Sequence, residues 1–233
     1  MVQNLELSVI ETKQETPTVK SIKLEKNNFD SKPGQYMITE LDANDTENGN
    51  TRPLSIASSP TEKFLLFSTK ISESPFKKKF NELKIGDKVK LKGPVGIFVL
   101  NENAENIIFL GGGIGITPFR SMIKYATDKK LPIKLTLLYS NKTSDEICYK
   151  SEWPLMEKQN PNLKVVHTIT DEPGWSGKKE RICEQTIKEF SNDLSNTLFY
   201  FCGPPAMVDS LSQLLKSMNV PQANIKIEKF DGY

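Results

Sequence analysis

Residues 107–119 decide the fold, and they read Ile107-Ile108-Phe109-Leu110-Gly111-Gly112-Gly113-Ile114-Gly115-Ile116-Thr117-Pro118-Phe119. The apolar run at the start predicts a strand buried on both faces. Four glycines within five residues follow, and then Thr117 and Pro118, which suit the cap and the first turn of a helix. Such a turn offers backbone N–H groups and a helix N-terminus to an anion. The stretch therefore predicts a phosphate-binding turn.

The composition is that of a globular protein with no strong charge. The chain has 233 residues, 37% of them hydrophobic, and a net charge of +2, which does not call for nucleic acid or an anionic membrane as partner. No apolar run approaches the ~20 residues that span a bilayer, and no signal peptide is evident at the N-terminus. The three cysteines are far apart, which argues against disulfides, zinc and iron–sulfur clusters. We expect a cytoplasmic protein without a metal site.

The first hundred residues predict an antiparallel β-barrel. Short segments rich in Ile, Leu, Val and Thr alternate with turn residues, as in small barrels. The expected strands are Glu6–Glu11, Val19–Leu24, Gln35–Leu41, Ile56–Ser58, Phe64–Ser72 and Lys88–Leu91. Phe76–Leu83 is long enough for one short helix, and the polar stretch Asp42–Asn50 is expected to be an exposed loop.

The rest of the chain alternates strands with helices, which predicts a parallel sheet in an α/β domain. The expected strands are Ile107–Leu110, Leu135–Tyr139, Leu163–Ile169, Leu198–Cys202 and Ile225–Phe230. The expected helices are Thr117–Thr127, Ser151–Gln159, Glu180–Phe190 and Pro205–Met218, the second weakened by Pro154. We therefore predict two domains, 1–102 and 103–233.

Four motifs in register resemble one family. They are Arg52-Pro53-Leu54-Ser55-Ile56-Ala57-Ser58-Ser59-Pro60, Gly93-Pro94-Val95-Gly96-Ile97-Phe98, the glycine turn, and Phe201-Cys202-Gly203-Pro204-Pro205-Ala206-Met207. In this order they are similar to the ferredoxin–NADP reductase superfamily, from Pro33-Gly34-Gln35-Tyr36 to the end of the chain. The resemblance implies an FAD-binding barrel domain followed by an NAD(P)-binding domain.

In the first domain the resemblance implies a flavin site. Arg52 carries a planar cation that suits a phosphate, and Ser55 stands where the family donates a hydrogen bond to the flavin ring. Leu54, next to Pro53, replaces the family's ring-stacking Tyr, and we expect it to cover the ring instead. Taken alone, Arg52 is equally explained as a surface residue beside a strand.

A second part of the flavin site is implied downstream. Thr69-Lys70-Ile71 resembles the strand beside the flavin tail, and Ser74-Pro75-Phe76-Lys77-Lys78 resembles the turn that meets the pyrophosphate at a helix start. The lysine run Lys77-Lys78-Lys79 is open to three interpretations. It is a solvated face, a phosphate contact, or a docking surface for an acidic carrier protein.

In the second domain the resemblance implies a nicotinamide nucleotide site. Gly113-x-Gly115-x-x-Pro118 carries Pro where the usual dinucleotide fingerprint has Gly, as in the reductases, and places Thr117 and Pro118 where nicotinamide meets flavin. Ser140, Asn141 and Lys142 follow the second strand, with no acid until Asp145. These three residues could accept a 2′-phosphate, which favours NADPH over NADH. An exposed loop explains these three residues equally well.

The C-terminal third supplies the remaining candidates. Cys202 is expected beside the nicotinamide carbon, followed by the turn residues Gly203, Pro204 and Met207. Glu228 and either Phe230 or Tyr233 match a terminal acid and an aromatic that covers the flavin; a last strand with a frayed tail is the alternative.

Other polar residues of this domain are expected to be structural or on the surface. The loop Asp171–Gly177 is also found in the family. Arg181 is best explained as a helix-surface residue, and His167, Cys148 and Cys183 as structural.

The motifs together predict a flavoenzyme that passes hydride between NAD(P)H and flavin, and single electrons between flavin and a separate carrier such as ferredoxin or flavodoxin. A small molecule that accepts both electrons together is the alternative acceptor. Ser55, Cys202, Glu228 and Phe230 are the predicted catalytic residues. FAD is preferred over FMN. The alternative is a reductase or relay subunit of a larger oxygenase or dehydrogenase complex, with little activity alone.

Overall fold

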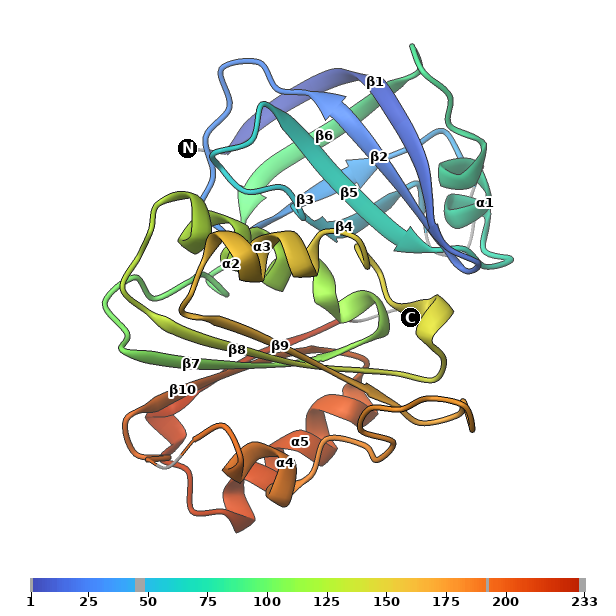
Figure 1. Ribbon diagram of the computed structural model, residues 1–233. Helices are drawn as coiled ribbons and strands as arrows, with labels where there is room; N and C mark the ends of the chain where they lie inside the picture. The colour runs from blue at the N-terminus through green and yellow to red at the C-terminus, as the bar shows by residue number, and fades with distance from the viewer. Residues whose placement is uncertain (1, 45–48, 192, 231–233) are drawn as a thin grey trace. The chain divides into compact units, whose positions relative to one another are not determined.

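The computed structural model describes residues 2–44, 49–191 and 193–230 (Figure 1). The chain divides into two compact units. The first contains residues 1–100 and 117–125, and the second contains residues 101–116 and 126–233. The second segment of the first unit is most of helix α2 (Thr117–Asp128).

The first unit is a curled antiparallel sheet with strand order β4-β3-β6-β1-β2-β5. Its strands are β1 (Gln3–Thr16), β2 (Val19–Glu25), β3 (Tyr36–Glu40), β4 (Thr51–Ser55), β5 (Phe64–Lys70) and β6 (Lys88–Val95). Strand β1 pairs with β6 through Gln3–Ser8 and with β2 through Val9–Thr16, with a shift in register between Val9 and Glu11. Such a bulge bends a strand, so β1 can serve both partners around the curve.

The core of the first unit is made by alternate residues of these strands and by helix α1 (Pro75–Glu82). The helix buries Phe76 and Phe80, which lie one turn apart on a single face. At its C-terminal end the ammonium group of Lys20 donates hydrogen bonds to the carbonyls of Asn81 and Leu83. These contacts satisfy carbonyls that a helix end leaves open.

One predicted strand of the first unit was wrong. The strand lies at Thr51–Ser55, not at Ile56–Ser58, and it contains Pro53. Strand β4 is the last in the sheet order, where the missing N–H of a proline is tolerated. Residues 45–48 of the predicted loop lie outside the described residues.

The second unit is a parallel sheet with strand order β11-β10-β7-β8-β9. Its strands are β7 (Asn106–Gly112), β8 (Lys134–Asn141), β9 (Leu163–Ile169), β10 (Thr197–Gly203) and β11 (Ile225–Lys229). Helix α3 (Trp153–Gln159) lies on one face, and α4 (Glu184–Lys188) and α5 (Pro205–Ser217) lie on the other (Figure 1). The predicted fold class, an antiparallel β domain followed by a parallel α/β domain, is confirmed.

Two helices of the second unit begin later than predicted. Pro154 lies in the first turn of α3, where its missing N–H is not needed, so it starts the helix instead of weakening it. Helix α4 begins at Glu184 because Cys183 is extended and Lys178 forms a β-bridge with Thr168. Among the helices of the described residues, none is both long enough and apolar enough to cross a lipid bilayer.

A buried ion pair holds the first unit together. The guanidinium of Arg120, in α2, donates two hydrogen bonds to the Glu62 carboxylate, at 2.9 and 3.1 Å, and one to the carbonyl of Ala57 at 2.8 Å. Both side chains are largely buried, with 4% and 12% of their surfaces exposed. Removing one partner of such a pair leaves an uncompensated buried charge.

We expect Arg120→Met to lower the free energy of unfolding by about 3–5 kcal/mol, because it leaves the largely buried Glu62 carboxylate without its guanidinium partner. Lys188→Met is the control, since it removes an exposed i,i+4 pair with Glu184 worth about 0.5 kcal/mol or less. Denaturant unfolding measures both. Equal losses for the two variants would contradict the assignment.

Candidate functional site

The glycine turn lies at the carboxyl end of β7 in the second unit. It is the 3₁₀ turn η1 (Gly113–Ile116), and Gly113 has a φ of +50°, which favours glycine. A β-carbon on Gly115 would lie 2.5 Å from the carbonyl oxygen of Cys202. Only glycine fits there, so the turn packs directly on β10. Thr117 and Pro118 are buried, whereas Gly113 is exposed.

The end of β10 forms the other side of this contact. Cys202 is fully buried, and its thiol donates a hydrogen bond to the carbonyl of Gly115 at 3.1 Å. Burial, and secondly Glu228, raise the pKa of the Cys202 thiol well above its ordinary value, so the group is not a nucleophile at neutral pH. Gly203 has a φ of +145°, and Met207 lies close to it, while Pro204 is exposed.

The predicted terminal acid lies beside this thiol. Glu228, on β11, is in register with Cys202 on β10, and its side chain is half-buried. Burial raises the pKa of the Glu228 carboxyl from 4.5 to about 7. The N–H of Phe230 donates to the carbonyl of Gly203 at 2.9 Å, which continues the chain along the same edge. Tyr233 lies outside the described residues.

The ends of β7, β10, β11 and β8 therefore meet at one edge of the sheet. The direction in which the chain adds strands reverses between β7 and β10. Strands β8 and β9 follow β7 on one side of it, and β10 and β11 lie on the other side. In open α/β sheets such a switch point, at the carboxyl ends of the strands, is where nucleotides bind. The structure thus brings the glycine turn, Cys202, Gly203, Glu228 and Phe230 to the same edge.

A carboxylate from another loop lies against the segment after β8. Ser140 is half-buried, Asn141 is buried and Lys142 is exposed. The Glu172 carboxylate, from the loop after β9, accepts hydrogen bonds from the N–H of Ser144 at 2.6 Å and from its hydroxyl at 3.2 Å. This carboxylate was missed in the sequence because it is 28 residues away from its partner.

The first unit carries a cationic cluster at the start of α1. Arg52 lies over the ring of Phe76 at 5.2 Å and donates to the carbonyls of Gly49 and Thr51. Burial, and then the positive charges of Arg52 and Lys70, lower the pKa of the Lys77 ammonium. Lys77 therefore lies in the positive field of Arg52 and Lys70, a field that attracts anions.

Buried hydroxyls accompany these cations. The hydroxyl oxygens of Thr69 and Ser74 are buried without a hydrogen-bond partner, and Ser74 precedes the first turn of α1. A buried polar atom without a partner costs free energy, so such atoms call for an explanation. A phosphate at the start of α1 would supply an acceptor for the Ser74 hydroxyl.

Of the two residues expected at the flavin ring, Leu54 lies elsewhere than expected. Leu54 is 3% exposed and packs in the core of the first unit, so its side chain is not available to cover a ring. Ser55 is buried at the end of β4, opposite Tyr36 of β3.

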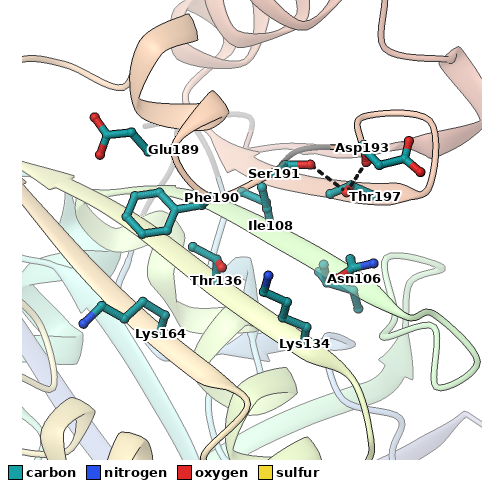
Figure 2. A pocket seen from close by; sticks show the side chains of 11 residues that line it. Asn106, Ile108, Lys134, Thr136, Lys164, Glu189, Phe190, Ser191, Asp193 and Thr197 are labelled. Atoms are coloured by element: carbon teal, nitrogen blue, oxygen red, sulfur yellow. Dashed lines mark hydrogen bonds between the residues drawn. The ribbon is translucent and has the colours of Figure 1, made fainter.

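A cavity of about 360 Å³ lies at the other edge of the second sheet (Figure 2). It is lined by the first residues of four strands and by the segment after α4, including Asn106, Lys134, Lys164, Phe190 and Thr197. Because it lies at the amino ends of the strands, it is separate from the glycine turn and takes no part in the predicted nucleotide site.

The residues expected to be structural are mostly buried. His167 packs its ring against Tyr139 at 5.9 Å, and burial, with a contribution from Lys150, lowers its pKa. Cys148 is buried and Cys183 is partly exposed. Arg181 is exposed and precedes α4, so the expectation that it lies on a helix was wrong.

Comparisons with known proteins agree with this arrangement. Residues 109–213 match the family described as "Oxidoreductase NAD-binding domain". A subunit of the Na(+)-translocating NADH-quinone reductase of Methylococcus capsulatus is 31% identical over 202 residues, which are 78% of this chain and 49% of that protein. Flavohemoprotein A of Dictyostelium discoideum is 28% identical over 215 residues, 85% of this chain and 52% of that protein. The chain spans about half the length of these curated relatives.

Two solved structures align with nearly the whole length of this chain. The flavohem-like FAD/NAD-binding domain of nitric oxide dioxygenase from Vibrio cholerae aligns with a TM-score of 0.85 at 21% identity, covering 97% of this chain and 98% of that one. A ferredoxin NADP+ reductase from Neisseria gonorrhoeae with bound FAD and NADP aligns with a TM-score of 0.84 at 20% identity, with the same coverage. The fold is that of the two-domain FAD/NAD-binding reductases. The resemblance to the ferredoxin–NADP reductase superfamily that the sequence predicted is confirmed by these matches.

We expect the half-buried Glu228 to make stability depend on pH. Its folded pKa of about 7 lies above its ordinary 4.5, so the folded state holds a proton that the unfolded state releases. The free energy that the protonated Glu228 contributes to stability is therefore fully present below about pH 4.5, and it is lost as the pH rises through about 7. Between pH 4.5 and 8, the melting temperature of the wild type should fall relative to that of Glu228→Gln, which has no carboxyl group to ionise. A wild type that gains stability relative to the variant over this range would contradict the assignment.

Proposed function

We propose that the protein is a flavin-dependent oxidoreductase. It passes hydride between a nicotinamide nucleotide and a bound flavin, and single electrons between that flavin and a separate carrier such as ferredoxin or flavodoxin. The observation that carries the proposal is the cationic cluster of Arg52, Lys70 and Lys77. The unpartnered hydroxyls of Thr69 and Ser74 lie in the same stretch of sequence. These groups fit the phosphate tail of a flavin nucleotide.

The cofactor supplies the redox chemistry, because a flavin accepts two electrons together and releases them singly. The residues of this chain bind and orient the two nucleotides. Arg52, Lys77 and the start of α1 would hold the flavin phosphate, and the glycine turn on β10 would hold the nicotinamide nucleotide. Cys202, with its buried protonated thiol, fixes the turn through the Gly115 carbonyl. Hydride transfer between two rings needs proximity and exclusion of water, which suits a site with few titrating groups.

FAD is the proposed flavin, since the Neisseria gonorrhoeae structure of the same fold has FAD bound. FMN remains the alternative. The free cysteines support the expected reducing, cytoplasmic compartment.

A second proposal concerns the setting in which the enzyme works. Relatives of this chain include components and parts of larger proteins, such as the NADH-quinone reductase component of Methylococcus capsulatus and flavohemoprotein A. A role as the reductase subunit of a larger complex is therefore the second candidate. Purification under native conditions separates the two: a single chain that reduces an artificial dye supports the stand-alone enzyme, and an inactive chain recovered with partners supports the subunit.

The flavin site is tested by binding. We expect the purified protein to bind FAD, and Arg52→Ala and Lys77→Ala each to bind it about 10- to 100-fold more weakly, since each loses a charge-assisted contact to phosphate. Lys90→Ala is the control: it removes an exposed cation of the same unit that pairs with Glu40 at 3.6 Å. Flavin fluorescence titration measures all four proteins. No flavin binding by the wild type, or equal binding by all the variants, would refute the proposal.

The charges after β8 favour NADH as the nucleotide. Glu172 lies on the backbone of Ser144, and the N–H of Asp171 donates to the carbonyl of Lys142 at 2.8 Å. Two acidic residues thus adjoin the segment that the sequence suggested for a 2′-phosphate. A carboxylate repels that phosphate but accepts hydrogen bonds from the ribose hydroxyls of NADH. We therefore propose NADH in place of the NADPH that the sequence favoured.

We expect Glu172→Gln to raise kcat/KM for NADPH relative to NADH about fivefold, the effect of removing a like-charge repulsion of ~1 kcal/mol. Glu105→Gln is a matched control, because Glu105 also accepts a side-chain hydrogen bond, from Asn196 at 2.8 Å. It lies at the opposite edge of the sheet, just before β7. Dye-coupled steady-state assays give the ratios, and a wild type that prefers NADPH would contradict the choice of NADH.

A further inference from the structure

Tyr139 joins two segments that both border the predicted nucleotide site. Its side chain is fully buried at the end of β8. The hydroxyl donates a hydrogen bond to the carbonyl of Gly113 at 2.9 Å and accepts one from the N–H of Cys148 at 3.3 Å. Its ring packs against Trp153, with centroids 6.4 Å apart, and against His167. Packing fixes the ring, so the hydroxyl is a rigid link.

The glycine turn needs such a link. Gly113 is exposed, has a φ of +50°, and has nothing within 4 Å of the place where a side chain would begin. Side-chain packing therefore does not hold it, and glycine samples many backbone conformations at little cost. The C=O and N–H of a planar peptide point in opposite directions. Holding the Gly113 carbonyl against Tyr139 thus fixes the direction of the next N–H, that of Ile114.

The other end of the link is the segment after β8. The carbonyl of Cys148 accepts a hydrogen bond from the indole N–H of Trp153 at 2.8 Å, so this residue is held through both its N–H and its carbonyl. The same segment contains Ser144, to which Glu172 is bound. The Tyr139 hydroxyl is therefore hydrogen-bonded both to the glycine turn and to the segment after β8 that carries Glu172 on Ser144.

The chemistry of the hydroxyl suits this role. A phenol has one proton to donate and can accept one hydrogen bond in return. Burial, and secondly the neighbouring Cys148, raise the pKa of the Tyr139 hydroxyl well above its ordinary value. It stays protonated in the working range of pH, so it donates to Gly113 throughout.

We propose that Tyr139 is a positioning residue for nucleotide binding: its hydroxyl holds the glycine turn and the segment after β8 in the arrangement that receives the diphosphate and the adenosine ribose. The inference rests on the proposed function, because it assigns the residue to the nucleotide site of that reaction. Tyr139 touches backbone and acts through the glycine turn, so its loss changes affinity more than the rate of hydride transfer.

The test compares Tyr139→Phe with Tyr200→Phe in the flavin-loaded full chain. Tyr200 is a matched control: it is buried on β10, packs against Phe109, and its hydroxyl accepts a hydrogen bond from the N–H of Asn101 at 3.1 Å. Each variant loses a buried hydroxyl that bonds a backbone N–H, so both should lower the melting temperature. The two hydroxyls differ in their partners: that of Tyr139 bonds the glycine turn through Gly113, whereas that of Tyr200 bonds Asn101.

We expect Tyr139→Phe to raise the dissociation constants for NADH and for ADP about tenfold, with Tyr200→Phe unchanged, because an unheld turn must be ordered when the diphosphate binds. The limiting rate of flavin reduction should stay within about twofold of the wild type, as expected for a loss of binding that is equal in ground state and transition state. Unchanged affinities in Tyr139→Phe, or equal losses in both variants, would overturn the inference. A wild type that binds neither NADH nor ADP would refute the proposed function itself.

Hydrogen exchange in the wild type gives an answer even if Tyr139→Phe does not fold. On addition of ADP, the amides of Gly113–Ile116 and of Cys148 should gain protection together, because one hydroxyl relates them. Protection that rises in the glycine turn and stays unchanged at Cys148 would contradict the link.

Discussion

The site in the second unit depends on one close approach of two backbones. Gly115 lies so near the carbonyl of Cys202 that a single added carbon atom would lie 2.5 Å from it. Glycine at this position lets η1 pack on β10, and the Cys202 thiol then bonds the Gly115 carbonyl. This contact sits at the switch point of the sheet, where β7 and β10 are neighbours. It thereby packs the glycine turn on Cys202, which is in register with the half-buried Glu228 of β11.

Much of the fold could be predicted from local pattern. The buried run before the glycine turn gave β7, and alternating strands and helices gave the parallel sheet. Strand β4 was missed because its Pro53 reads as a strand breaker, which is true in the middle of a sheet and false at its edge. The late start of α4 was also missed, since the bridge between Lys178 and Thr168 depends on a strand ten residues earlier in the chain.

The site was predicted less completely, because its charges come from segments far apart in the sequence. The glycine turn and the start of α1 could be found from short motifs whose chemistry is local. Glu172 could not, because only folding brings it to Ser144. Tyr139 looked like one more apolar strand residue, and nothing local shows that its hydroxyl meets Gly113. Leu54 shows the opposite case, in which a motif position expected at the flavin belongs to the core.

The proposed reaction transfers electrons from a nicotinamide nucleotide to a flavin bound by this chain. An anaerobic titration of the FAD-loaded protein with NADH, followed by visible absorbance, tests it most directly. We expect about one equivalent of NADH to bleach the flavin band, since one hydride carries the two electrons that the flavin accepts. A flavin band that persists in excess NADH and in excess NADPH would contradict it.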